Sequence, residues 1–165
     1  MDKSGHLTIR PARPEDSEAI LRVHSASVRE TCGPRYAPEV IESWCRVKSA
    51  EDYERDMTSP GQIVLIAEVD GEAIGFARLD IASVEIAALY VDPRGQGSGV
   101  GRALLERMEQ TCIDRQLGSV NLNATLNAVG FYERMGFEVV RQDRFRLPDG
   151  VEIPCVKMKK ELGRA

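Results

Sequence analysis

Long hydrophobic runs are missing from this sequence. The longest runs are short, such as residues 63–67, and none approaches the roughly 20 apolar residues that a membrane-spanning helix needs. Residues 1–6 also lack the apolar stretch that marks a secretory signal. We therefore expect a cytoplasmic protein with no membrane partner.

Histidine and cysteine are scarce. The chain has 2 histidines and 4 cysteines, and no two cysteines are spaced as in a zinc-binding motif. We expect no metal site, and free thiols in a reducing compartment. A cysteine nucleophile would need a histidine as its base, and the positions of His24 and Cys32 in one predicted helix do not identify such a pair.

Neither sign of charge dominates. The 22 basic and 26 acidic side chains leave a net charge of −4, which provides no basic surface for nucleic acid and no polybasic surface for a membrane. With 165 residues, 42% of them hydrophobic, the chain has the size and apolar content of a single globular domain covering residues 1–165.

The spacing of apolar and turn-forming residues predicts strands that alternate with helices. The predicted strands are residues 7–10, 62–69, 73–79, 84–91, 119–124, 137–147 and 151–158. The predicted helices start at Pro14, after Pro38, after the loop 94–101 and at Asn127, while residues 48–60 fit either a helix or a loop. This order predicts a mixed α/β domain, with an antiparallel meander in front and a βαβ unit behind, and excludes a regular doubly wound fold.

The loop between the fourth strand and the next helix is rich in glycine. Gly95, Gly97, Gly99 and Gly101 occupy alternate positions. Glycine lets backbone N–H groups approach an anion closely, and the following helix adds the positive end of its dipole. The loop therefore predicts a phosphate-binding site, with a merely flexible turn as the alternative.

Two common nucleotide motifs fit this loop poorly. A Walker loop needs Lys-Ser/Thr after its last glycine, but Arg102 and Ala103 follow Gly101. A dinucleotide-binding loop needs an acidic residue at the end of the next strand, and the strand 119–124 ends without one. An ATPase is therefore disfavoured, and so is a nicotinamide-dependent oxidoreductase.

Two segments resemble the GNAT superfamily of acetyl-CoA-dependent N-acetyltransferases. Residues 96–101 fit its pyrophosphate loop, Gln/Arg-x-x-Gly-x-Gly/Ala, although a register that starts at Arg94 fits as well. Residues 127–137 resemble its Asn-Ala…Phe-Tyr-Glu-x-x-Gly-Phe segment. The resemblance implies a mostly antiparallel central sheet flanked by helices, with a splayed strand pair at the coenzyme site.

The resemblance also implies which residues bind acetyl-CoA. The pantetheine arm would pair with the strand before the loop, where a bulge is permitted because Ile86 and Leu89 look core-like but cannot share a face of a regular strand. The expected coenzyme residues are Leu89, Tyr90, Val91, Gln96, Gly97, Ser98, Gly99, Val100, Gly101, Arg102 and Asn127. For Asn127, capping of the next helix is the alternative.

The chemistry of acetyl transfer suggests two catalytic residues. An amine must lose a proton before it attacks, since a lysine-type amine has a pKa of about 10.4. Glu85 matches the position of the family's glutamate base, with a solvated outward glutamate as the alternative. Tyr132 matches the tyrosine that acts as general acid near the coenzyme sulfur, with a core tyrosine as the alternative.

Tyr36 and Trp44 fall in the part of the chain that would form the acceptor side. They could line a substrate pocket or simply pack. Together these observations predict an acetyltransferase that moves an acetyl group directly from acetyl-CoA to a primary amine in a ternary complex. A non-catalytic acetyl-CoA-sensing module is the alternative. The resemblance also implies a homodimer, for which the strand 151–158 offers a surface.

Overall fold

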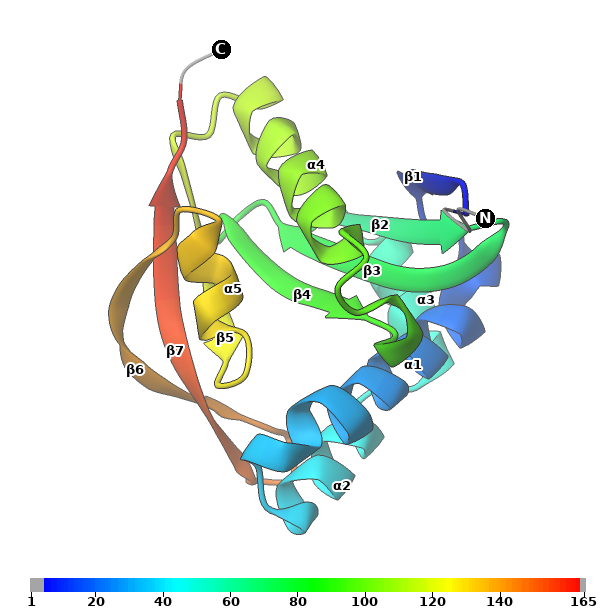
Figure 1. Ribbon diagram of the computed structural model, residues 1–165, viewed down its shortest axis with the longest axis vertical. Helices are drawn as coiled ribbons and strands as arrows, with labels where there is room; N and C mark the ends of the chain where they lie inside the picture. Colours follow the sequence, from blue (N-terminus) through cyan, green and yellow to red (C-terminus); the bar gives the residue numbers. More distant parts are fainter. Residues whose placement is uncertain (1–4, 164–165) are drawn as a thin grey trace.

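The computed structural model describes residues 5–163, which form a seven-stranded sheet in the order β1-β2-β3-β4-β5-β7-β6 (Figure 1). Neighbouring strands are antiparallel except for β4 and β5, which run parallel. The strands are β1 (Leu7–Pro11), β2 (Gln62–Val69), β3 (Glu72–Asp80), β4 (Glu85–Val91), β5 (Ser119–Thr125), β6 (Glu138–Arg146) and β7 (Glu152–Glu161). The predicted mixed α/β fold is confirmed.

Helices cover both faces of the sheet. They are α1 (Ser17–Ala26), α2 (Pro38–Arg46), α3 (Ala50–Thr58), α4 (Val100–Asp114) and α5 (Val129–Arg134). Figure 1 shows α4 on one side of β2–β4 and α1 and α3 on the other, and each side has its own apolar core. A third core joins α2 to the β6–β7 hairpin. No helix within residues 5–163 has the length and apolar content to cross a membrane.

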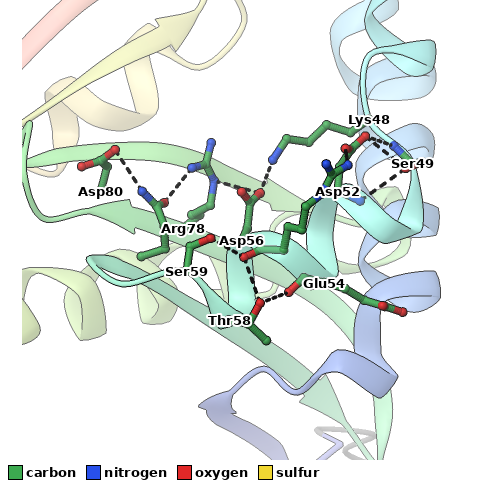
Figure 2. Close-up of polar contacts among 11 residues, drawn as sticks. Lys48, Ser49, Asp52, Glu54, Asp56, Thr58, Ser59, Arg78 and Asp80 are labelled. Carbon is green, nitrogen blue, oxygen red and sulfur yellow. Dashed lines mark hydrogen bonds and ion pairs between the residues drawn. The ribbon is translucent and has the colours of Figure 1, made fainter.

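The segment that the sequence left open as helix or loop contains α3, which a polar network fastens to the sheet (Figure 2). Its first turn is a capping box, in which Asp52 N donates to Ser49 Oγ at 3.3 Å and Ser49 N donates to Asp52 Oδ2 at 2.8 Å. Asp56 then pairs with Lys48 and lies 3.6 Å from Arg78 Nε on β3. These contacts fix α3 against the middle of the sheet.

The sheet opens between β4 and β5. Their parallel pairing covers only Glu85 with Asn121 and Ile86 with Leu122. On the other edge of β4 the register shifts, so that Ala87 has no opposite residue on β3. This bulge is the irregularity that the apolar pattern permitted. Beyond it, β4 and β5 diverge and form the expected splayed pair.

The C-terminal hairpin corrects one prediction. Strand β7 lies between β5 and β6 and is paired along both of its edges, so it offers no edge to a second chain. The outer strand is β6. The prediction that residues 151–158 form a dimer edge is therefore wrong, because the last strand inserts into the sheet.

Candidate active site

A cleft of about 430 Å³ occupies the space where β4 and β5 diverge. The glycine loop closes one end, and α5 and the segment after α1 form its sides. The expected coenzyme residues that line it are Leu89, Tyr90, Val91, Gln96, Gly97, Gly99, Val100, Gly101, Arg102 and Asn127. Ser98 does not line the cleft, because its hydroxyl donates to the carbonyl of Gly95.

The structure distinguishes the two possible registers of the loop motif. Arg94 is held away from the cleft by Asp92, which accepts from Arg94 Nε at 3.0 Å and from Arg94 Nη2 at 3.1 Å. This guanidinium also holds the pKa of Asp92 below its usual range. Gln96 lines the cleft, and its Nε2 donates to the Val91 carbonyl at 3.2 Å. The geometry therefore favours the register that starts at Gln96.

The start of α4 presents backbone donors to the cleft. Gly99 caps the helix with a φ of +88°, a left-handed conformation that glycine adopts without strain. The first N–H groups of a helix have no intrahelical acceptor, and they stand at the positive end of its dipole. Gly101, in this first turn, has no side chain between the backbone and the cleft. This end of the cleft fits a pyrophosphate.

Strand β4 presents its backbone to the same space. Leu89 and Val91 point to the core beneath α4, whereas Ala88 and Tyr90 pack toward α1 and α3. Because β5 turns away beyond Ile86, the β4 edge that follows it lines the cleft without a neighbouring strand. An extended chain carrying amide groups can pair with such an edge.

Asn127, which precedes α5, and Tyr132, which lies within it, both line the cleft. The Oδ1 atom of Asn127 is buried and accepts no hydrogen bond from the described residues, and the side chain does not cap α5. An amide donor in the cleft would satisfy this oxygen. Tyr132 is buried between Phe131 and Phe137, and burial raises the pKa of its phenol, which therefore stays protonated. Tyr132 thus places a protonated phenol at the cleft wall.

Glu85 lies at the closed end of the splay. It pairs with Asn121 on β5 and with Asp80 on β3, and its neighbour Ile86 lines the cleft although Glu85 does not. Burial raises the pKa of the Glu85 carboxyl and Asp80 raises it further, while Lys157 opposes them. The structure therefore brings Glu85 next to the cleft, but not into its wall.

The two aromatic residues expected on the acceptor side do not line the cleft. The hydroxyl of Tyr36 donates to the Pro154 carbonyl at 2.7 Å and accepts from Leu126 N at 3.0 Å, so it ties the chain to two backbone segments. Trp44 is only 5% exposed, in the core between α2 and the C-terminal hairpin. Both residues therefore make packing and backbone contacts outside the cleft wall.

One wall of the cleft, formed by the segment after α1, was not predicted from the sequence. The segment Ser27–Cys32, expected to continue the first helix, is a π-helix, and it turns Ser27, Thr31 and Cys32 toward the cleft. Asn123 and Thr125 on β5 complete this wall. A π-helix has no reliable sequence signature, and an unexplained Ser and Thr near the end of a helix were the available signal.

The buried thiol and imidazole nearby are not arranged as a nucleophile and its base. Burial raises the pKa of Cys32 to about 11, so the thiol stays protonated. His24 is buried outside the cleft wall, with its ring centroid 4.8 Å from that of Tyr90. Burial, together with the charge of Lys48, lowers the pKa of His24 to about 4.

Comparisons with known proteins agree with this geometry. The family model described as "Acetyltransferase (GNAT) domain" matches residues 32–162. YafP of Escherichia coli K12, an uncharacterised N-acetyltransferase, is 27% identical over 141 residues, which cover 84% of this chain and 86% of YafP. An uncharacterised N-acetyltransferase of Mycobacterium tuberculosis H37Rv, Rv2669, is 29% identical over 141 residues, which cover 80% of this chain and 89% of the relative.

Solved structures match over almost the whole chain. A GCN5-related N-acetyltransferase from Rhodopseudomonas palustris has a TM-score of 0.88 at 25% identity, covering 98% of this chain and 99% of the other. The PaiA N-acetyltransferase from Thermoplasma acidophilum, solved in complex with coenzyme A, has a TM-score of 0.82 at 28% identity, covering 94% and 99%. With a family match that spans most of its residues, the chain belongs to the GNAT family of acetyltransferases.

Proposed function

We propose that this acetyltransferase moves the acetyl group of acetyl-CoA directly to a primary amine, with both substrates bound in the cleft between β4 and β5. One observation carries the proposal: a single cleft joins the glycine loop, an unpaired strand edge and the buried phenol of Tyr132. The complex of the Thermoplasma acidophilum relative with coenzyme A supports the choice of coenzyme.

The described residues fit acetyl-CoA along its length. The first turn of α4 and the loop from Gln96 would hold the pyrophosphate, because they line the cleft, the first N–H groups of a helix have no intrahelical acceptor, and Arg102 adds a positive charge. The edge of β4 from Ala87 to Val91 would pair with the amides of the pantetheine arm. The unsatisfied Oδ1 of Asn127 would accept from one of those amides.

Three steps then need protein groups. Glu85 accepts the proton of the acceptor ammonium through a water molecule, because Glu85 itself does not line the cleft although its neighbour Ile86 does. The freed nitrogen lone pair forms a bond to the acetyl carbon, and an N–H at the β4 bulge stabilises the negative charge on the acetyl oxygen. Tyr132 gives its proton to the sulfur as the carbon–sulfur bond breaks.

Direct transfer is supported by the state of the only cysteine in the cleft wall of the described chain. Its raised pKa keeps Cys32 protonated, and buried His24 is not in the wall where it could remove that proton. A covalent acetyl-cysteine route lacks an activated nucleophile here.

The experiment is thiol release from acetyl-CoA across a panel of amines, polyamines, amino acids and peptides. We expect no thiol release without an acceptor, and amine-dependent release with at least one member. Tight acetyl-CoA binding with no turnover on any member would support the sensing module instead.

We also propose that two copies associate through β6. The strand is at the edge of the sheet, and the three most exposed large apolar residues of the described chain lie on it: Val139 at 53%, Val140 at 49% and Phe145 at 47%. A two-fold antiparallel pairing centred on Gln142 sets Arg141 of each copy opposite Asp143 of the other. This charge pattern is complementary to itself, so we assign the edge to a second copy of this chain.

A further inference from the structure

Glu85 has a second carboxylate directly opposite it. In the register of β3 and β4, Asp80 pairs with Glu85 immediately before the bulge. Side chains of directly opposed residues share one face of the sheet and lie close together. Two carboxylates in this position resist simultaneous ionisation, and their surroundings decide which of them holds a proton more readily.

The surroundings keep Asp80 ionised. Gln62 Nε2 donates to its Oδ2 at 3.0 Å and Ser83 N donates to its Oδ1 at 3.2 Å, and these bonds lower the pKa of Asp80. Gln62 is itself held by Arg78, whose Nη1 donates to its Oε1 at 2.7 Å. Figure 2 shows that this network continues from Arg78 through Asp56 to Lys48. Asp80 is thus fixed by a chain of contacts that reaches α3.

The surroundings of Glu85 differ from those of Asp80. Within residues 5–163 no side chain or backbone N–H donates to its carboxylate, so its oxygens remain available. The charged groups that act on it are Asp80 and Arg78 on β3 and Lys157 on β7. Asp80 opposes its ionisation, while the two cations favour it. One carboxylate of the pair is therefore anchored, and the other is free to exchange a proton beside the cleft.

We propose that Asp80 is a positioning residue, a permanently ionised carboxylate whose charge strengthens Glu85 as the acceptor of the substrate's proton. The inference rests on the proposed function, in which Glu85 is the base. The proton leaves the acceptor nitrogen, passes through a water molecule to Glu85 and later returns to solvent, and the nitrogen keeps its electron pair for the acetyl carbon. A base works best when its pKa lies near the operating pH, and the charge of Asp80 moves Glu85 in that direction.

The test is a titration of Glu85 by carbon-13 NMR of the glutamate carboxyl carbons, with the signal identified by its loss in Glu85→Gln. In Asp80→Asn the midpoint for Glu85 should fall by about half to one pH unit, because a neighbouring negative charge is removed. Asp80→Ser, which can still accept from Ser83 N, should give the same fall and serves if the asparagine variant does not fold. Asp80→Glu keeps the charge and should restore most of the wild-type midpoint.

Asp52→Asn is the matched control. It removes the same charge from the first turn of α3, where the amide oxygen of asparagine can still accept from Ser49 N, and Asp52 is not among the groups that act on Glu85. The midpoint for Glu85 should not move in this variant. An unchanged or raised midpoint in Asp80→Asn, or an equal fall in Asp52→Asn, overturns the proposal.

A kinetic measurement separates this inference from the proposed function. With an acceptor from the amine panel, the acidic limb of kcat/KM should move to lower pH in Asp80→Asn, and the plateau should drop about two- to fivefold. If the NMR midpoint falls and the acidic limb does not, Asp80 acts on a residue that is not the base, and its positioning function is overturned. If no amine is acetylated at all, the proposed function fails, while the titration still decides whether Asp80 controls Glu85.

Discussion

Tyr132 and Glu85 illustrate how strongly the surroundings of a side chain determine whether it holds a proton. Tyr132 lies in an apolar shell that keeps its phenol protonated, so a proton is present at that hydroxyl. Glu85 lies between an anion and two cations at the closed end of the splay, which suits a group that exchanges protons. The two residues therefore differ in what a change of pH should do to their variants.

Tyr132→Phe keeps the ring in its aromatic packing and removes only the hydroxyl. Coenzyme binding should survive, while turnover should fall by roughly 10²–10⁴-fold, the usual contribution of a positioned acid. Steady-state kinetics together with calorimetric titration of acetyl-CoA measures both quantities. Full turnover in this variant would mean that Tyr132 only packs in the core and donates no proton.

Glu85→Gln should lose rate mainly at low pH, where free amine is scarce. Raising the pH should partly restore its rate, because the amine then arrives without its proton. Tyr132→Phe should show no such rescue, since a higher pH supplies no acid. Identical pH–rate profiles for the two variants would contradict this division of the two steps.

His24 should make stability depend on pH. Its pKa of about 4 in the folded protein lies below the ordinary 6.5, so the unfolded chain binds the proton more readily. The stabilisation is complete above pH 6.5 and is lost as the pH falls toward 4, by about 3 kcal/mol in all. Urea unfolding at several pH values should show this loss, and His24→Phe should show a flatter dependence. Equal slopes for the two proteins would mean that the buried imidazole does not govern the effect.

At the scale of elements, the site depends on where two strands stop pairing and where one helix begins. The apolar and turn patterns predicted all seven strands, the glycine loop and the helix after it, because alternation and turn chemistry are local properties. The insertion of β7 beside β5 could not be predicted, since strand order depends on contacts between distant residues. The π-helix at Ser27–Cys32 also lacked a local signal, and with it the hydroxyl-lined wall was missed.

Gly101 offers a matched test of the helix start. An added Cβ would lie 3.5 Å from Val91 Cγ2 and 3.6 Å from Phe131 Cζ, ordinary contact distances, so small substitutions should fold. Gly101→Asp and Gly101→Asn have nearly the same shape and differ in charge. The aspartate should weaken acetyl-CoA binding by at least a further tenfold, about 1.4 kcal/mol, because it opposes the pyrophosphate. Equal acetyl-CoA affinities for the two variants would mean that the pyrophosphate does not bind at the start of α4.

At the scale of the whole molecule, the sheet has one outer strand at its C-terminal side, and the C-terminal hairpin also covers α2. If two copies pair through β6, Arg141 and Asp143 set the register. Arg141→Asp should then produce a monomer, because it places two carboxylates opposite each other. The double variant Arg141→Asp with Asp143→Arg should restore the dimer.

Sedimentation at tens of micromolar, about the concentration at which even a modest dimer forms, distinguishes these species. A monomeric wild-type protein contradicts the assignment of β6 to a second copy. A dimer that neither variant disturbs would place the interface elsewhere.

In the proposed direct transfer, the acetyl group passes from acetyl-CoA to the amine without forming a bond to the protein. Its most direct test is to mix the enzyme with acetyl-CoA alone, then with an accepted amine, and to record free thiol and the intact mass of the protein on the time scale of one turnover. We predict no thiol release and no change in protein mass until the amine is added, followed by equal amounts of thiol and acetylated amine. Stoichiometric thiol release in the absence of amine, together with the mass gain of one acetyl group on the protein, would contradict direct transfer.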